Sequence, residues 1–174
     1  MAATVQISRY HGSGPTKVNS VTRTDWLSLA PAGFTTGSED LRSTFPISKP
    51  SSGSVWSFDN WHKFECTSLG SSTAISDLKY YSSGAPGTGW TLRTTANTTP
   101  ISPTYVAPDA NSKAGTTITT AMPTAEPGTY TIACPGPTNT MGVASSLYVA
   151  DQLECASTVT GGVSLTIQWK YTEA

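Results

Sequence analysis

The strongest structural signal in this sequence is a strict alternation of apolar and polar residues close to its C-terminal end. From residue 163 to residue 171 every second residue is apolar or aromatic, namely Val163, Leu165, Ile167, Trp169 and Tyr171. The residues between them are polar. A strand with one buried and one exposed face has this two-residue period, whereas a helix has a period of about 3.6 residues. The sequence therefore predicts a strand over residues 163–171.

A second alternating run precedes this strand and ends in a glycine-containing connection. Its apolar row consists of Leu147, Val149, Leu153 and Cys155. Asp151 interrupts the row, which predicts a bulge or an exposed strand end at that point. Thr160-Gly161-Gly162 lies between the two runs, and glycine tolerates the positive φ that tight hairpin turns require. We therefore expect a long C-terminal β-hairpin over residues 147–171.

Further strand patterns occur along most of the chain. They cover residues 4–10, 55–66 (one strand, or two divided at Asp59-Asn60), 74–81 with a bulge, 90–95 and 129–134, with weaker ones near 103–106 and 116–120. In the run 129–134, Tyr130, Ile132 and Cys134 share one face. With 15 Gly, 12 Pro and no clear helical pattern, the sequence predicts an all-β fold of about eight strands. The spacing is typical of an antiparallel β-sandwich or a jelly-roll-like single domain.

The N-terminal part lacks a regular pattern after its first strand. Residues 16–50 contain apolar residues at irregular spacing, and so long a stretch without an element is unusual in a compact domain. We expect residues 1–54 to form an N-terminal strand plus an irregular arm or docking region. Residues 55–174 are expected to form the β-sandwich domain.

Charge and hydropathy exclude several classes of partner. The formal net charge is −1, the isoelectric point is about 6.0, and the ten basic residues are scattered. Nucleic-acid binding depends on clustered positive charge, so it is not expected. No apolar run approaches the roughly 20 residues of a membrane-spanning helix, and no secretory signal is recognisable at residues 1–10. We expect use in the cytoplasm, or the earlier removal of a signal.

No motif for catalysis or for metal or cofactor binding stands out. The three cysteines Cys66, Cys134 and Cys155 have no zinc-like spacing and are expected to be small buried residues without disulfides. His62 falls in an apolar row, which predicts a partly buried histidine with a hydrogen-bond partner. Two carboxylates far apart in sequence could still form an acid–base pair. We expect a non-enzymatic protein with no catalytic residues, cofactor or metal.

Aromatic side chains are the remaining candidates for a binding surface. Trp56 and Trp169 lie on apolar rows and are expected in the core. Trp61 and Tyr81 have the opposite parity to their aromatic neighbours, so we expect them to be exposed. The candidate interface set is Trp26, Phe34, Trp61 and Tyr81.

The order of segments from residue 55 onward resembles a group of tailed-phage virion proteins encoded among head and neck genes. The segments are VWSFDNWHKFECTS, TAISDLKYYSSGAPGTGW, TAEPGTYTI and SSLYVADQLECASTVTGGVSLTIQWKYTE. The closest agreement is at Tyr148, Gln152-Leu153, Gly161-Gly162 and Leu165 to Glu173. The resemblance covers residues 55–174, and residues 1–54 match no family that we can name.

This resemblance implies a β-sandwich structural protein of a phage particle and brings no catalytic residues with it. The expected role is that of a decoration (cement) protein, which binds and stabilises the capsid shell within the virion. Its partners would be the major capsid protein or other virion proteins, and it would be a homo-oligomer, for example a trimer. Two alternatives stay open. One is a neck, tail or fibre component, and the other is a carbohydrate-binding β-sandwich module with a row of exposed aromatics.

Overall fold

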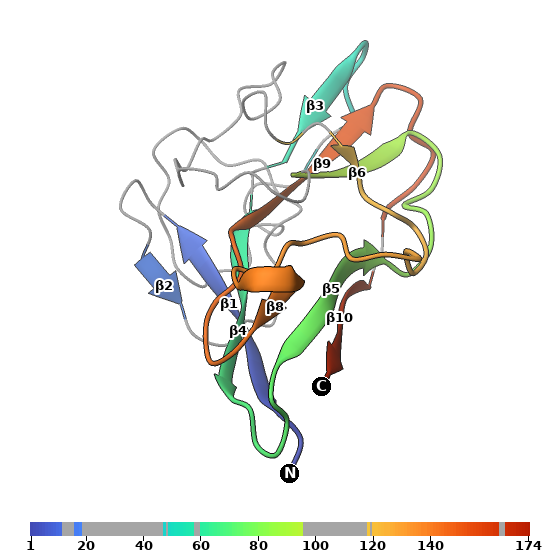
Figure 1. Ribbon diagram of the computed structural model, residues 1–174. Coiled ribbons are helices and arrows are strands. Elements are labelled where there is room, and N and C mark those ends of the chain that lie inside the picture. Colours follow the sequence, from blue (N-terminus) through green and yellow to red (C-terminus); the bar gives the residue numbers. More distant parts are fainter. Residues whose placement is uncertain are drawn as a thin grey trace.

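The computed structural model describes most of the chain, and the residues that it describes form ten strands (Figure 1). The described residues are 1–11, 16–18, 47, 49–57, 60–95, 118, 120–163 and 166–174, with the backbone alone for 9–11, 16–18, 60 and 61. These residues contain one 3-10 turn, Pro137–Asn139, and no α-helix. Nor does any helix in them have the length and apolarity to cross a membrane. The prediction of an all-β fold is confirmed.

The strands form two antiparallel sheets. The larger sheet contains seven strands. Six of them follow the order β2-β1-β4-β9-β6-β7, and the seventh, β3, pairs with β9. The smaller sheet contains three strands in the order β10-β5-β8. Their bounds are β1 Thr4–His11, β2 Thr16–Val18, β3 Ser54–Trp56, β4 Asn60–Ser68, β5 Ile75–Ser82, β6 Trp90–Thr94, β7 Thr120–Ala121, β8 Thr140–Met141, β9 Val149–Ala156 and β10 Ile167–Glu173. A jelly-roll strand order is not established by this topology and stays a prediction.

The core lies between the two sheets, as in a β-sandwich. From the larger sheet, Phe64 and Leu153 are buried, and from the smaller sheet Leu78 and Tyr80 are buried against them. The Phe64 ring lies 6.0 Å from the Trp169 ring of β10, measured between centroids. Buried apolar area of this kind is the main source of stability in a small domain, at about 25 cal/mol per Å².

The predicted bulge in the segment 74–81 is present in β5. Between the pairs Lys170↔Lys79 and Thr172↔Ser76, three steps along β5 oppose two steps along β10. Asp77 has a φ of 52°, in the left-handed region, and absorbs the extra residue. Because of this bulge, Ile75, Leu78 and Tyr80 are all buried although they do not share one parity.

The predicted C-terminal hairpin is wrong, although both of its strands exist. Strand β9 pairs with β3, β4 and β6 in the larger sheet, whereas β10 pairs with β5 in the smaller one. The connection between them therefore crosses from one sheet to the other (Figure 1). Trp90 Nε1 donates to the carbonyl of Gly161 at 2.8 Å, and the Ser83 N–H donates to the carbonyl of Thr166 at 2.8 Å. These contacts hold the connection across the end of the sandwich.

The predicted strand 129–134 is also wrong. The segment carries no strand, and Tyr130 is 41% exposed while Ile132 and Cys134 are buried. It nevertheless follows the edge of β5, because the N–H groups of Thr131 and Ile132 both donate to the carbonyl of Leu78, at 3.0 and 3.1 Å. The Thr131 hydroxyl accepts from the Tyr80 N–H at 2.6 Å. A side chain thus replaces part of the backbone ladder.

The expected boundary at residue 54 does not separate the first strand from the sandwich. Strand β1 pairs with β4 from Val5↔Cys66 to Tyr10↔Trp61, so it belongs to the larger sheet. On the C-terminal side of residues 19–46, Ile47 packs on the core and Lys49 Nζ donates to the carbonyl of Val159 at 3.1 Å. Residues 19–46 lie outside the described part, and both of their flanks are attached to the sandwich.

The region 55–66 was predicted to form either one strand or two strands divided at Asp59-Asn60, and it contains the two strands β3 and β4. Strands β3 and β4 both pair with the same edge of β9, which makes β9 the centre of the larger sheet. The predicted inward row of His62, Phe64 and Cys66 is confirmed by their burial.

Candidate functional site

Three polar side chains meet in the interior, one from each of three strands. They are His62 of β4, Tyr80 of β5 and Asp151 of β9, and they are 1%, 2% and 0% exposed. The Tyr80 hydroxyl donates to Asp151 Oδ2 through a short hydrogen bond. His62 Nε2 lies 2.8 Å from the Tyr80 oxygen and 3.4 Å from Asp151 Oδ2. We call these three residues the buried triad.

The hydrogen-bond inventory of the buried triad assigns the proton positions. A phenol hydroxyl has one proton, and Tyr80 uses it to donate a hydrogen bond to Asp151. The Tyr80 oxygen can then only accept from His62, so the Nε2 atom of His62 carries a proton. Both sheets take part, because Tyr80 comes from the smaller sheet and its two partners from the larger. The buried triad is therefore a polar link across the sandwich.

The aromatic ring of Trp169 packs against the buried triad. The Trp169 ring of β10 lies 4.5 Å from the Tyr80 ring and 5.6 Å from the His62 ring, between centroids. Burying a carboxylate is costly unless hydrogen bonds compensate the lost hydration. Tyr80 supplies such a bond, which explains how Asp151 is tolerated in an apolar row. With exposures of 0–2%, the triad contributes to packing, and of its three residues Tyr80 borders a cavity.

The expected bulge or exposed end at Asp151 is wrong. The β6–β9 register runs unbroken from Trp90↔Cys155 to Thr94↔Asp151, so Asp151 lies in a regular part of β9. His62 is a histidine with a partner, as predicted, but it is fully buried. A signal was present in the sequence: His62 and Asp151 are the two ionisable interruptions of otherwise apolar strand rows, which is the pattern that a buried pair produces.

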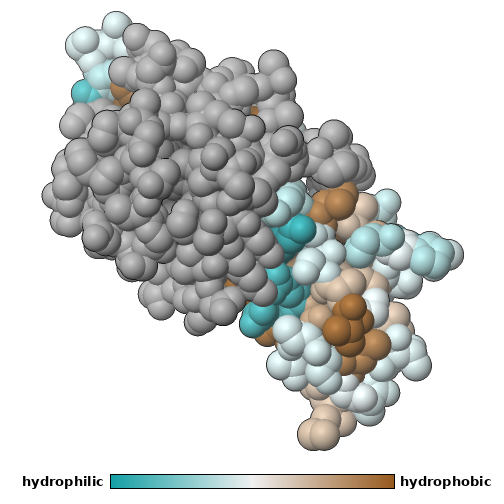
Figure 2. Space-filling view, turned by 90° about the vertical axis from the view of Figure 1, so that its left-hand side faces the viewer, coloured by the Kyte–Doolittle hydropathy of each residue, from teal (hydrophilic) through white to brown (hydrophobic). Residues whose placement is uncertain are grey.

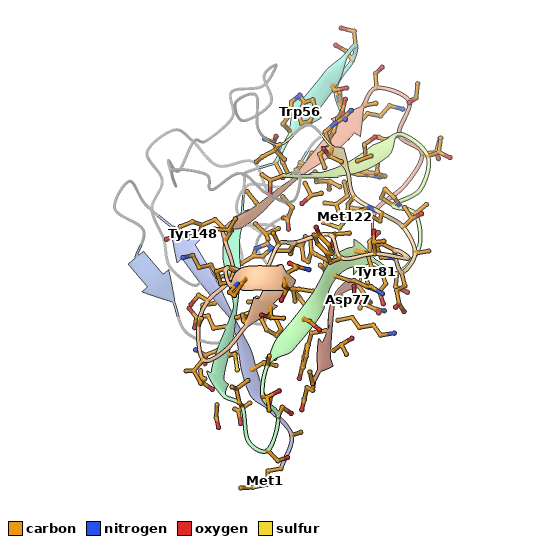
Figure 3. All side chains as sticks on the ribbon, viewed as in Figure 1. Met1, Trp56, Asp77, Tyr81, Met122 and Tyr148 are labelled. Carbon is orange, nitrogen blue, oxygen red and sulfur yellow. The ribbon has the colours of Figure 1, made fainter. Side chains whose placement is uncertain are left out.

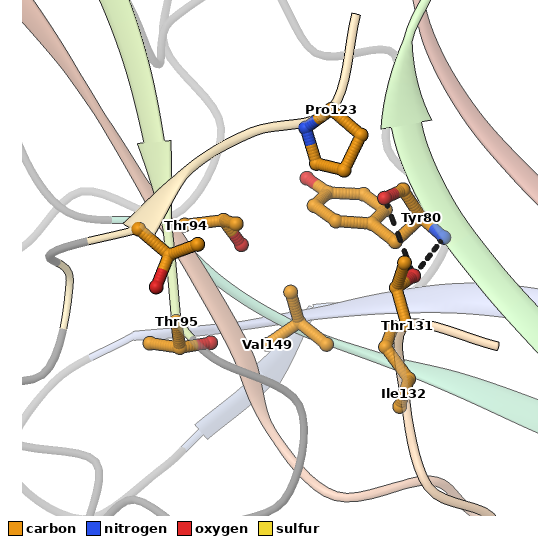
Figure 4. A pocket seen from close by; sticks show the side chains of 8 residues that line it. Tyr80, Thr94, Thr95, Pro123, Thr131, Ile132 and Val149 are labelled. Carbon is orange, nitrogen blue, oxygen red and sulfur yellow. Dashed lines mark hydrogen bonds between the residues drawn. The ribbon is translucent and has the colours of Figure 1, made fainter. Parts of the chain in front are cut away.

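A cavity of about 150 Å³ lies beside the buried triad. Its lining residues are Tyr80, Thr94, Thr95, Thr120, Pro123, Thr131, Ile132 and Val149. Figure 4 shows Tyr80 and Thr131 on one side, Thr94 and Thr95 on the other, Pro123 above and Val149 below. The walls thus come from both sheets and from the segments that follow β6 and β7. The cavity leaves no local pattern in the sequence, because its residues come from six separate places in the chain.

The candidate interface residues fall into three groups. Trp26 and Phe34 lie outside the described residues. The backbone of Trp61 is in β4, and its side chain is not described. Tyr81 was expected to be exposed, and this is wrong: it is 7% exposed, and its hydroxyl donates to Gln168 Oε1 at 2.8 Å. Figure 3 shows Tyr81 beside the smaller sheet and Met122 between the sheets.

The described surface offers few exposed large apolar side chains. Met1, Tyr130 and Val143 are the exposed ones in the described ranges. Figure 2 shows one face of the molecule, and its coloured part carries a small brown patch among pale residues. Trp56 is buried, as expected, and the guanidinium of Arg93 lies 5.6 Å from its ring centre. A carbohydrate-binding surface needs a row of exposed aromatics, and Tyr130 is the single exposed aromatic that the described residues provide.

An ion pair and three buried thiols are among the charged and nucleophilic groups of the described part. Arg93 Nη2 lies 2.7 Å from Glu154 Oε2 across neighbouring strands β6 and β9. Cys66, Cys134 and Cys155 are free and buried, as predicted. Burial raises the pKa of the Cys134 and Cys155 thiols above their ordinary value, which disfavours the reactive thiolate. No group of three metal-ligating side chains occurs within the residues that the structure covers.

Comparison of the chain with protein-family models, with curated proteins and with solved structures found no match.

Proposed function

We propose that this chain is a non-enzymatic structural protein of a bacteriophage particle, and that it binds the capsid shell as a decoration protein. The sequence resemblance over residues 55–174 supports this role, and so does the all-β sandwich that such proteins share. The observation that carries the proposal concerns the two flanks of residues 19–46. The strand β2 before this segment and Ile47 after it both belong to one sandwich, so the segment is an insertion in the sequence of that domain.

The inserted segment has the composition of a docking element. It contains Trp26, Phe34 and further apolar residues at irregular spacing. Long connections without secondary-structure patterns are uncommon in compact domains, and binding loops are one of the functions that they serve. Large aromatics are enriched at the energetic centres of protein interfaces. In this proposal Trp26 and Phe34 contact the major capsid protein or another virion protein, and Trp61 extends the contact from β4.

Symmetry adds to the strength of such contacts. A shell presents many identical sites, and an oligomer, for example a trimer, engages several of them together. Each contact can then be weak, because linked binding events raise the overall affinity by about 10² to 10⁴. The proposal therefore places the protein in the virion as a homo-oligomer.

The sharpest test replaces residues 19–46 with a Gly/Ser linker that joins Val18 to Ile47. Removing residues 1–50 instead would also remove β1, which pairs with β4 in the larger sheet, and would damage the fold. The linker variant should keep the urea unfolding transition of the sandwich and lose cosedimentation with phage particles. A matched control replaces the exposed loop residues 84–88 with Gly/Ser and should retain cosedimentation. Binding by the linker variant at the level of the unaltered chain would contradict the docking role.

Copy number separates the decoration role from the alternative roles in the same particle. Mass spectrometry of purified particles should give this chain in a ratio to the major shell subunit of about one or a simple fraction. A few copies per particle would point instead to a neck, tail or fibre component. Absence from the particles would contradict a virion role altogether.

A further inference from the structure

The cavity beside the buried triad has an apolar body of defined size. The rings of Tyr80 and Pro123 and the aliphatic side chains of Ile132 and Val149 form most of its wall. Tyr80, Ile132 and Val149 are themselves buried, so the wall is held by core packing. A cavity of about 150 Å³ accommodates one benzene-sized ring.

Two threonine hydroxyls give the cavity one polar corner (Figure 4). Thr94 Oγ1 donates to the carbonyl of Ala150 at 3.2 Å, which leaves its lone pairs as acceptors. Thr95 Oγ1 accepts from the Ala150 N–H at 3.2 Å, which leaves its own proton as a donor. A hydroxyl group both donates and accepts, so it matches this neighbouring pair.

Two other hydroxyls on the cavity wall, those of Tyr80 and Thr131, are already used, and a third belongs to the exposed residue Thr120. Thr131 Oγ1 accepts from the Tyr80 N–H at 2.6 Å and donates to the Tyr80 carbonyl at 3.3 Å. The described lining residues carry no charge. A charged ligand would lose its hydration there without gaining a counter-charge, and this disfavours it strongly.

We propose that this cavity is a binding site for one small neutral molecule that combines an aromatic ring with a single hydroxyl group. The ring fills the space between Tyr80 and Val149, and the hydroxyl bonds to Thr94 and Thr95. Phenol is the simplest probe of this class. For a ligand of this size we expect a dissociation constant on the order of 1 mM. This site is independent of the proposed role in a phage particle.

The test titrates the full chain with phenol, benzene and benzoate and follows the methyl NMR signals of Ile132 and Val149. Phenol should shift both signals saturably, benzene should bind about tenfold more weakly, and benzoate should give no saturable shift. Thr120 lines the cavity from an exposed position, so Thr120→Phe should block the cavity without disturbing the core. It should weaken phenol binding at least about tenfold. The neighbouring exposed Ala121 is not among the lining residues, and Ala121→Phe should change binding less than about twofold.

The hydroxyl recognition has its own variant pair. Thr95→Val removes the donor but leaves the Thr94 acceptor, so it should lower the phenol-to-benzene affinity ratio, whereas Thr95→Ser should restore the ratio. The ratio is informative even if Thr95→Val lowers stability, because both probes meet the same destabilised protein. Three results would each overturn the proposal: no saturable phenol shift up to about 20 mM, equal binding by Thr120→Phe and the unaltered chain, or an unchanged ratio in Thr95→Val.

Discussion

The carboxylate of Glu173 accepts a hydrogen bond from the backbone N–H of Ala3 at 3.0 Å. Glu173 ends β10 in the smaller sheet, and Ala3 immediately precedes β1 in the larger sheet. The same carboxylate accepts from the Ser72 hydroxyl at 2.8 Å, in the turn between β4 and β5. One side chain thus joins both sheets at the end of the sandwich where the chain termini lie (Figure 1).

We predict that Glu173→Gln makes the protein less stable at neutral pH but not in acid. The Ala3 N–H, followed by the Ser72 hydroxyl, lowers the pKa of Glu173 below its ordinary value of 4.5. A carboxyl whose pKa is lower in the folded state stabilises the fold above its unfolded pKa, and this contribution is lost as the pH falls through the folded pKa. The melting temperature should fall by a few degrees at pH 7, and the difference should vanish near pH 2.

The control for this prediction is Thr172→Gln, on the exposed face of the same strand. It should shift the melting temperature less than Glu173→Gln at pH 7. A Glu173→Gln deficit of constant size from pH 7 to pH 2 would show that the ionised carboxylate does not make the stabilising contact.

The faces of single strands could be predicted from the sequence because the two-residue period is a local property. The alternation around Phe64 and around Trp169 placed both side chains in the core, and both pack there. The pairing of strands could not be predicted in the same way. Alternation gives the buried face of β9 and of β10, but both faces of a sandwich core produce the same pattern, so two neighbouring strands can belong to one sheet or to opposite sheets.

The segment 129–134 shows a second limit of local patterns. Ile132 and Cys134 are buried as a strand would bury them, but the backbone between them does not continue a ladder. The hydroxyl of Thr131 takes the place of a strand neighbour on Tyr80, and a threonine is common in both strands and loops. Nothing in the sequence distinguishes these two uses.

The buried triad was partly visible in the sequence. Its histidine was expected to have a partner, yet the identity of that partner depends on contacts between residues 62, 80 and 151 in three different strands. Tyr80 and Tyr81 are adjacent on β5, and both are buried, at 2% and 7% exposure. Opposite parity predicts that they point to opposite faces of the strand, but it does not tell whether the second face is covered, so Tyr81 was wrongly expected at the surface.

Removing the hydroxyl of Tyr80 should destabilise the protein more than removing the hydroxyl of the adjacent Tyr81. Tyr80→Phe takes away the donor to Asp151 and the acceptor of the His62 Nε2–H, in a site that is 0–2% exposed. We expect a loss of about 1–3 kcal/mol in the free energy of unfolding, measured by urea denaturation. Tyr81→Phe removes one partly buried bond to Gln168 and should cost about 0.5–1 kcal/mol. Equal losses would contradict a structural role for the triad.

Gly89→Ala should be far more destabilising than Gly87→Ala. Both glycines have positive φ, at 81° and 96°, so alanine is strained by about 1–2 kcal/mol at either position. A Cβ at Gly89 would also lie 2.4 Å from the backbone nitrogen of Val159, whereas a Cβ at Gly87 would meet nothing within 4 Å. The Gly89 variant should therefore lose about 3 kcal/mol or more in urea denaturation. If both variants lost a similar amount of unfolding free energy, the backbone at Val159 would have to move away from the new Cβ at little cost.

Thr131→Val should destabilise the edge of β5, because the Thr131 hydroxyl bonds to both backbone groups of Tyr80. Valine has nearly the same shape and cannot form either bond, so the Tyr80 N–H loses its acceptor. We expect a loss of about 1–3 kcal/mol in the free energy of unfolding. In hydrogen exchange the Tyr80 amide should lose protection.

The matched control is Thr129→Val, two residues earlier in an exposed position of the same segment. It should leave the unfolding free energy within about 0.5 kcal/mol of the unaltered chain. If residues 129–134 formed a regular strand on β5, the backbone of the segment would protect the Tyr80 amide in both variants. Retained protection in Thr131→Val would therefore contradict the side-chain ladder and restore the strand that the alternation of Tyr130, Ile132 and Cys134 predicts.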